Sequence, residues 1–187
     1  MTINEINQLF EERRSHFVKE FNGAIAPIEL IEQLIQNANW APSHKLTLPW
    51  RFVVFGHNQL PNLVNATKQS MLEMNPETAD EKLTKVSKVE EKVSHAIAII
   101  LCPSNQVPLW EEHASIGAAI QNMYLTLNAW DHFGGYWTTG MATNSALVRE
   151  FLKLQSHEQH LGYFIIGGLD TKRKQAHRPA PIVDFKL

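Results

Sequence analysis

Apolar residues recur along the chain with the spacing of helices in some stretches and the composition of strands in others. At steps of three and four, Ile3, Ile6, Phe10 and Arg13 share one face of a helix, and Thr2 and Glu5 have the spacing of a capping box at its start. Similar patterns predict helices over the following ranges: 2–14, Pro27 to near Ala41, Leu60 to about Glu73, Asp80–Val93 after a break around Pro76, Pro108 to about Phe133, and Ser145–Leu154.

Strands are predicted where β-branched and aromatic residues run together. Arg51–Phe55 is typical of a buried strand ended by Gly56, and His95–Cys102 and Gly162–Gly168 are the next two. Between them, "GGYW" at 134–137 turns the chain into a short element. Because helices and strands follow one another in mixed order, we predict an α+β fold rather than a regular doubly wound one.

Length and composition favour one globular domain spanning residues 1–187. Hydrophobic residues make up 44% and charged residues 19%, which is an ordinary globular balance. The net charge of −2 gives no basic field for nucleic acid. The longest apolar run, Ala96–Leu101 followed by Cys102, is too short to cross a bilayer.

The location follows from the first residues and from cysteine usage. Met1–Phe10 contains Glu5 and no basic residue, so it does not resemble a secretory signal. The single cysteine, Cys102, cannot form an internal disulfide, and we expect a small buried apolar residue rather than a reactive thiol. The sequence therefore predicts a protein of the reducing cytoplasm.

Two basic segments are candidates for an anion site. Arg13, Arg14 and Ser15 follow the first helix, where they either complement the helix dipole or hold a phosphate. The tail "TKRKQAHRP", residues 171–179, is either a solvated basic face or a second set of phosphate ligands. If Arg178 lies near Arg13 and Ser15, one phosphate is held from both ends of the chain.

The loop "NWAPSHKLTLPW", residues 39–50, is polar, aromatic and stiff. Pro42 and Pro49 fix the backbone, which suits a surface that grips a flat ligand with little ordering cost. Trp40 and Trp50 offer rings for stacking, and His44 offers hydrogen bonds, although a lone loop histidine is usually structural.

The turn "GGYWTTG", residues 134–140, combines glycines that allow close backbone approach with Thr138 and Thr139, which can bond to a ligand edge. Searches for a dinucleotide fingerprint, a phosphate-binding glycine–lysine loop and a nucleophile elbow find nothing. His157 and His160 lack a third ligand at suitable spacing, so no metal is expected. Flat-ligand loops and an anion site without catalytic side chains indicate a cofactor enzyme.

Five stretches in this order resemble the FMN-dependent nitroreductase family, and its short single-domain members most of all. They are "RRS" at 13–15, "WAPSHKLTLPWRFVV" at 40–54, "ASIGAAIQN" at 114–122, "GGYWTTG" at 134–140 and "GYFIIGG" at 162–168. The resemblance covers about residues 9–184. It implies a nitroreductase-like fold with a mostly antiparallel central sheet flanked by helices, in an intertwined homodimer with FMN at the subunit interface.

The resemblance also implies roles for individual residues. Arg13, Arg14 and Ser15 hold the phosphate and ribityl chain, and Arg178 closes on the phosphate. The partner chain contributes Trp40, Pro42, Ser43 and His44 to the flavin site. Trp137, Thr138 and Thr139 border the isoalloxazine ring, and the apolar helix at 116–127 forms the interface core.

The implied activity is a ping-pong oxidoreductase with no catalytic side chain. NAD(P)H gives a hydride to flavin N5, and a nitroaromatic, a quinone or a similar electron-poor acceptor is then reduced at the same place. Two alternatives stay open: reduction or dehalogenation of one metabolite, with residues 72–91 and 107–113 setting the substrate, and an FMN-binding carrier or interaction protein without turnover. Phe17, Trp40 and Thr138 stand where the family commonly has basic residues, which affects the electron donor and the rate more than FMN binding.

Overall fold

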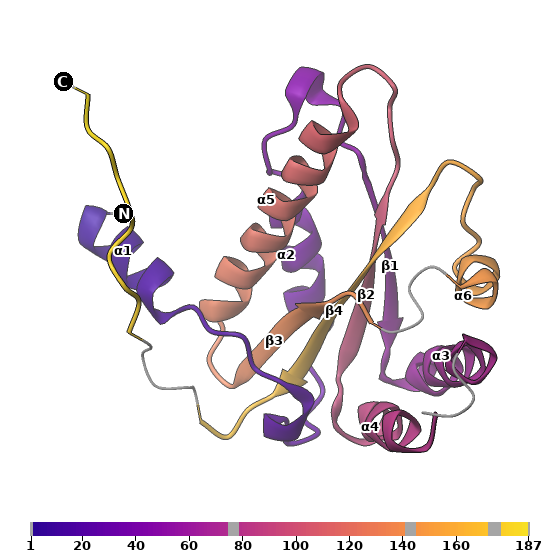
Figure 1. Cartoon of the computed structure of the whole chain (residues 1–187). Coiled ribbons are helices and arrows are strands. Elements are labelled where there is room, and N and C mark those ends of the chain that lie inside the picture. Colours follow the sequence, from indigo (N-terminus) through magenta and orange to yellow (C-terminus); the bar gives the residue numbers. More distant parts are fainter. Residues whose placement is uncertain (1, 75–78, 141–144, 172–176, 187) are drawn as a thin grey trace.

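A four-stranded sheet lies at the centre of the computed structural model, which describes residues 2–74, 79–140, 145–171 and 177–186 (Figure 1). The strand order is β1-β2-β4-β3, and every neighbouring pair is antiparallel. The strands are β1 (Trp50–Gly56), β2 (His95–Leu101), β3 (Phe133–Thr138) and β4 (Gln159–Gly168). The predicted α+β fold with an antiparallel sheet is confirmed.

The helices follow the predicted ranges closely. They are α1 (Ile3–Glu12), α2 (Ile28–Ala38), α3 (Leu60–Met74), α4 (Ala79–Lys92), α5 (Leu109–Asn128) and α6 (Ala146–Phe151), with short 3-10 turns η1 (Val18–Glu20), η2 (His44–Leu46) and η3 (His57–Gln59). Thr2 and Glu5 form the predicted capping box of α1. The break expected around Pro76 falls outside the described residues.

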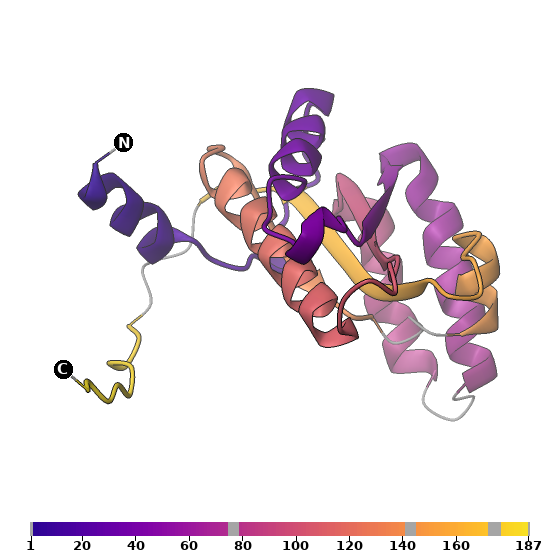
Figure 2. The same cartoon turned by 90° about the horizontal axis from the view of Figure 1, so that it is seen from above.

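Each face of the sheet has its own apolar core. Helices α2 and α5 cover one face, and α3, α4 and α6 cover the other (Figures 1 and 2). Strand β2 is buried at every position, with Ile97 and Ile99 facing α2 and α5 while Ala96 and Ala98 face the opposite helices. This alternation is the period of two that a strand imposes on its side chains.

Three local predictions were wrong. Strand β1 was predicted to be buried, but it is an edge strand in which only Phe55 is buried. The prediction failed because residue composition does not distinguish an edge strand from a central one. Residues 134–137 lie inside strand β3 rather than in a turn that leads into a short element. Helix α5 ends at Asn128, before the predicted Phe133, because Phe133 pairs with Gly168 in the sheet and His132 takes a left-handed φ of 60°.

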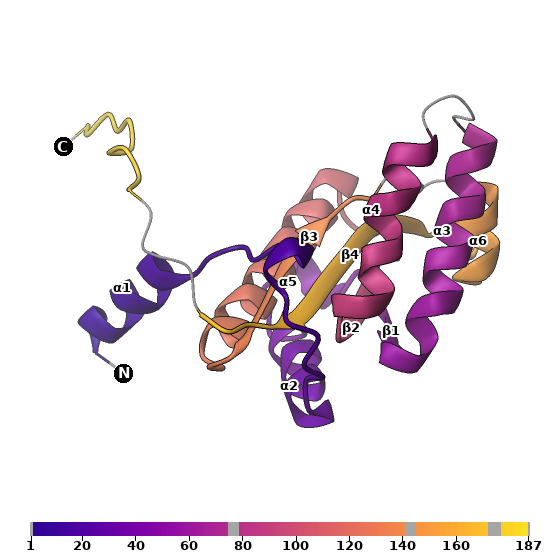
Figure 3. The same cartoon turned by 90° about the horizontal axis from the view of Figure 1, so that it is seen from below.

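The two ends of the chain project from the same side of the body (Figures 1 and 3). Helix α1 buries none of its residues, so its predicted apolar face, with Ile3 and Phe10, lies exposed. The tail at 177–186 exposes Ile182 and Phe185 as well. Within the described ranges, no helix is long and apolar enough to cross a bilayer.

Candidate functional site

The segment after α1 lies against β3 and carries the predicted anion ligands. The backbone N–H of His16 donates to the carbonyl of Gly135 at 3.0 Å. Gly134 is required at this contact, because a Cβ there would lie 2.7 Å from the His16 ring. The close approach predicted for these glycines therefore serves the chain's own N-terminal segment.

Arg13 lies in an electropositive cluster. Its guanidinium lies over the Tyr124 ring, 5.0 Å from the ring centre. Burial lowers the pKa of Arg13, and the positive charges of Arg178 and Arg14 lower it further. No carboxylate is among the groups that shift this pKa. The structure thus brings Arg178 into the electrostatic range of Arg13, as the sequence hypothesis required.

Ser15 is linked to β3 through Tyr124. Its hydroxyl donates to the Tyr124 hydroxyl at 3.4 Å, and the backbone N–H of Trp137 donates to the same oxygen at 2.7 Å. Arg14 donates from Nη1 to the carbonyl of Arg13 at 2.7 Å. These bonds fix the position of the cationic segment relative to the end of β3.

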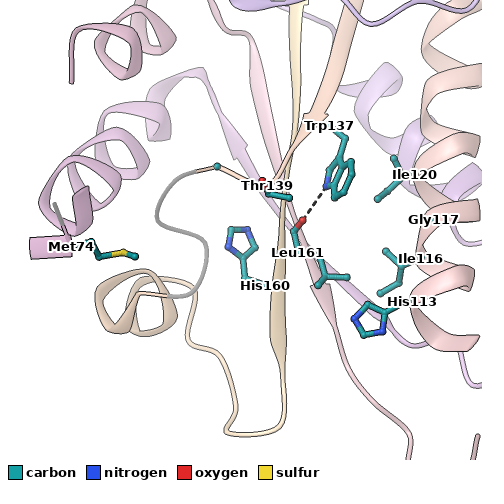
Figure 4. Close-up of a pocket in the computed structure, with 10 residues that line it drawn as sticks. Met74, His113, Ile116, Gly117, Ile120, Trp137, Thr139, His160 and Leu161 are labelled. Carbon is teal, nitrogen blue, oxygen red and sulfur yellow. Dashed lines mark hydrogen bonds between the residues drawn. The ribbon is translucent and has the colours of Figure 1, made fainter. Parts of the chain in front are cut away.

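A first pocket of about 620 Å³ opens between α5 and the ends of β3 and β4 (Figure 4). Trp137 faces it from β3 and Thr139 from the residue after that strand, while Ile116 and Ile120 face it from α5. The indole N–H of Trp137 donates to the carbonyl of Leu161 at 3.1 Å, which fixes the ring orientation. Two of the three residues predicted to border a flat ring therefore share one pocket.

A second pocket of about 690 Å³ lies on the other face of the sheet, between β3, β4 and the helices α3 and α4. Thr138 faces this pocket, because neighbouring strand residues point to opposite faces. Phe17 and Tyr136 line it too, with ring centres 5.0 Å apart in an edge-to-face pair. Gly140 lines both pockets, whereas Thr138 lines only the second and Thr139 only the first.

The loop around η2 lies at the opposite end of α5 from the cationic cluster. His44 Nδ1 hydrogen-bonds to the Glu111 carboxylate near the start of α5. The Ser43 hydroxyl accepts from the Leu48 N–H at 3.2 Å, while Pro42 is exposed and Trp40 is 80% exposed. The structure therefore keeps Trp40, Pro42, Ser43 and His44 away from the arginines of the same chain.

The backbone of this loop is strained. Lys45, Leu46 and Leu48 all have positive φ, at 54°, 53° and 44°. Left-handed conformations cost roughly 1–2 kcal/mol for a non-glycine residue, and they persist where the surroundings impose them. The stiffness that Pro42 and Pro49 favour in this loop stays a prediction.

Other titratable groups serve the fold. Glu158 accepts two hydrogen bonds from Arg51, at 3.0 and 2.6 Å, and the Cys102 thiol donates to it at 3.3 Å. Burial, together with Glu158, raises the pKa of Cys102 to about 11. In the part of the chain that the structure describes, no group of three or more His, Cys, Asp or Glu side chains could hold a metal.

Sequence reasoning missed Tyr124 as a site residue. It lies on the apolar stretch of α5, among Ile120, Met123 and Leu127, where an aromatic side chain indicates packing. The available signal was its hydroxyl, because a tyrosine on such a helix needs a partner for its polar tip.

Comparison with known proteins gives one consistent result. The model described as "Nitroreductase family" matches residues 10–168. A Haemophilus influenzae protein named "Putative NAD(P)H nitroreductase" is 25% identical over 181 residues, covering 95% of this chain and 94% of the relative.

Solved structures share the fold. A nitroreductase-like family protein from Bacillus cereus superposes with a TM-score of 0.80 at 23% identity, over 99% of each chain. The FMN-dependent nitroreductase NfnB from Mycobacterium smegmatis, solved in complex with NADPH, has a TM-score of 0.70 at 15% identity, over 89% of this chain and 88% of that protein.

Proposed function

The chain belongs to the nitroreductase family, and from that premise we propose that it is an FMN-dependent NAD(P)H oxidoreductase. The proposed acceptors are nitroaromatics, quinones and similar electron-poor compounds. The name of the Haemophilus influenzae relative supports a nicotinamide donor, and that of NfnB supports FMN as the cofactor. We take residues 1–187 as a single functional domain of the cytoplasm.

The observation that carries the proposal is the electrostatic interaction of Arg13 with Arg14 and Arg178, in the segment that leads to Phe17 of the second pocket. Like charges repel, and the lowered pKa of Arg13 reflects this repulsion in addition to burial. A phosphate dianion relieves the repulsion, and each guanidinium can donate two parallel hydrogen bonds to it. The three guanidinium groups therefore fit the phosphate of FMN, and the Ser15 hydroxyl, whose proton goes to Tyr124, can accept a hydrogen bond from a ribityl hydroxyl.

The pockets beside β3 fit a flat ring. Their volumes, about 620 and 690 Å³, lie within the range of small-molecule sites. The walls are mostly apolar; Trp137 and Thr139 line the first pocket, Thr138 lines the second, and Gly140 lines both. In this proposal Trp137, Thr138 and Thr139 border the isoalloxazine ring, and the surrounding walls exclude water.

The remaining ligands come from a partner subunit in an intertwined homodimer. Trp40, Pro42, Ser43 and His44 lie at one end of α5 and the arginines at the other, so a complete site needs a second copy of the loop. The exposed apolar residues of α1 and of the tail, such as Phe10 and Phe185, supply further surface for a partner. An interface built on α5 also accounts for the apolar character of that helix.

When bound, FMN supplies hydride transfer through N5, from NAD(P)H and then to the acceptor in a second half-reaction at the same place, which makes the cycle ping-pong. The protein positions the ring and sets its electrostatic environment. Phe17 and Thr138 present uncharged walls, which stabilise added negative charge less than cations would. Lys19, Lys88 and Lys92 line the same pocket, so the reduction potential of the bound cofactor depends on how far these cations offset the uncharged positions.

The test is an absorbance spectrum of the purified protein, before and after anaerobic NADPH and then NADH. Flavin bands that bleach support the reductase and identify its donor. Bands that persist with both donors favour a carrier without turnover. Colourless protein that does not take up added FMN would overturn the proposal.

A further inference from the structure

Tyr124 connects the phosphate-binding segment to the strand that borders the ring. Its aromatic ring packs edge-to-face on Phe164, with centres 4.9 Å apart, and carries the Arg13 guanidinium on its face. Its hydroxyl meets Ser15 on one side and the Trp137 N–H on the other. One side chain of α5 therefore contacts both parts of the candidate cofactor site.

The hydrogen bonds that Tyr124 makes within the protein leave its hydroxyl able to donate one hydrogen bond to a ligand. A phenol oxygen accepts hydrogen bonds through its lone pairs and donates a single proton. Ser15 and Trp137 both donate to this oxygen, so the remaining capacity of the group is its proton. Among the described residues, no hydrogen bond takes up that proton. The group faces a ligand as a donor.

The positive charges around the Tyr124 hydroxyl favour an anionic or oxygen-rich ligand as the acceptor of its proton. Arg13 lies on the Tyr124 ring, and the charges of Arg14 and Arg178 reach Arg13. Tyr124 is half-buried, so a bond made there is only partly exposed to water. A phosphate bound by Arg13, or a sugar hydroxyl that donates to Ser15, would therefore meet the Tyr124 proton as well.

We propose that Tyr124 is a binding and positioning residue of the flavin site: it donates its phenol proton to an oxygen of the ribityl phosphate, and its oxygen holds the Trp137 amide in place. The inference rests on the proposed function and extends it to a residue outside the predicted ligand set. It also makes Tyr124 a determinant of selectivity for FMN over riboflavin, because riboflavin lacks the phosphate that Arg13 and the Tyr124 proton would hold.

The test compares FMN and riboflavin binding to the wild-type protein and to Tyr124→Phe, by quenching of flavin fluorescence. The variant keeps the ring contacts with Phe164 and Arg13 but leaves the Trp137 N–H without its acceptor, so its melting temperature should fall by only a few degrees. Loss of a hydrogen bond to a charged group predicts an FMN affinity about 10-fold lower, with riboflavin affinity changed by less than about 3-fold. Tyr163→Phe is the matched control, because its buried hydroxyl has no hydrogen-bond partner in the described chain; its FMN-to-riboflavin ratio should not change.

A second readout uses the wild-type protein and needs no variant. The amide resonance of Trp137 should take different positions in the FMN and riboflavin complexes, because only the phosphate changes the polarisation of the Tyr124 hydroxyl. Identical positions would overturn the proposal. So would equal losses of FMN and riboflavin affinity in Tyr124→Phe, which indicate a packing role, or no loss of either. A wild-type protein that binds neither flavin would instead overturn the proposed function itself.

Discussion

Glu111 and Tyr124 lie on one helix and hold the two separated parts of the candidate site. Glu111 bonds to His44 of the η2 loop, while Tyr124 bonds to Ser15 and carries Arg13. With a rise of 1.5 Å per residue, positions 111 and 124 of α5 are about 20 Å apart. A symmetric antiparallel pair of α5 helices would place each Glu111 near the partner's Tyr124, with the two-fold axis midway, near Gly117.

Gly117 gives a direct test of this pairing. A Cβ at this position meets nothing within 4 Å in the protomer, so a side chain can be added to the helix. Gly117 also lines the first pocket, which a large side chain would enter, so sedimentation rather than FMN affinity reports on the interface. We expect Gly117→Trp to convert the dimer to a monomer in sedimentation velocity and to weaken FMN binding, with the helical circular dichroism unchanged. Gly117→Ala, which favours the helix by about 1 kcal/mol, should remain dimeric. A dimeric Gly117→Trp protein would place the interface elsewhere.

The arginine cluster should distinguish phosphorylated from unphosphorylated flavin. Removing one guanidinium from a phosphate removes roughly 1.5–3 kcal/mol of binding free energy. Arg13→Ala and Arg178→Ala should therefore each lower FMN affinity about 10- to 100-fold, with little change for riboflavin. Titrations at two salt concentrations should show a weaker salt dependence in both variants. If riboflavin affinity fell by the same factor, the arginines would have another role.

Much of the fold could be predicted because local patterns determine it. The capping box of Thr2 and Glu5 formed as expected, and the run at 95–101 became the buried central strand. The errors came from tertiary pairing, which no local pattern encodes. Phe133 continues the apolar spacing of α5, yet its backbone pairs with Gly168.

The roles assigned to the site residues stay predictions, and the structure bears only on where those residues lie. The sequence hypothesis put Arg178 near Arg13, and the pKa of Arg13 reflects that proximity. It could not show that Thr138 faces a different pocket from Trp137 and Thr139, because this depends on strand β3, which was not predicted. Tyr124 was missed because its hydrogen bonds join segments distant in sequence.

Glu158 should make the free energy of unfolding decrease as the pH is lowered into the acid range. The hydrogen bonds from Arg51 lower its pKa from 4.5 to about 2, so folding favours the ionised form. Its stabilising effect is complete above pH 4.5 and is lost as the pH falls toward about 2. Urea unfolding of Glu158→Gln at pH 7 should show a loss of about 2–3 kcal/mol, because Arg51 is partly solvated and keeps some hydration. The variant should also lack this part of the acid dependence.

His95 should add a second dependence nearer neutral pH. Burial lowers its pKa below 6.5, and the nearby His57 lowers it further, so the folded state favours the neutral ring. As the pH falls below 6.5, the unfolded chain takes up a proton first, and the free energy of unfolding decreases by at most about 1.4 kcal/mol per pH unit. In denaturant unfolding between pH 7.5 and 5, His57→Gln should reduce this slope. An unchanged slope would mean that burial alone sets the pKa of His95.

The reactivity of the Cys102 thiol can be used to probe the Arg51–Glu158 pair, because the thiol donates a hydrogen bond to Glu158. With its pKa raised to about 11 and its proton donated to Glu158, the thiol carries almost no thiolate at pH 8. We expect labelling by a disulfide reagent at pH 8 to be slower than that of an unfolded-chain cysteine by at least about 100-fold. Glu158→Gln removes the negative charge that helps to keep the thiol protonated, so the reaction should become faster. Rapid labelling of the wild-type protein would contradict the buried contact between Cys102 and Glu158, whereas slow labelling that Glu158→Gln leaves unchanged would make burial the sole protection.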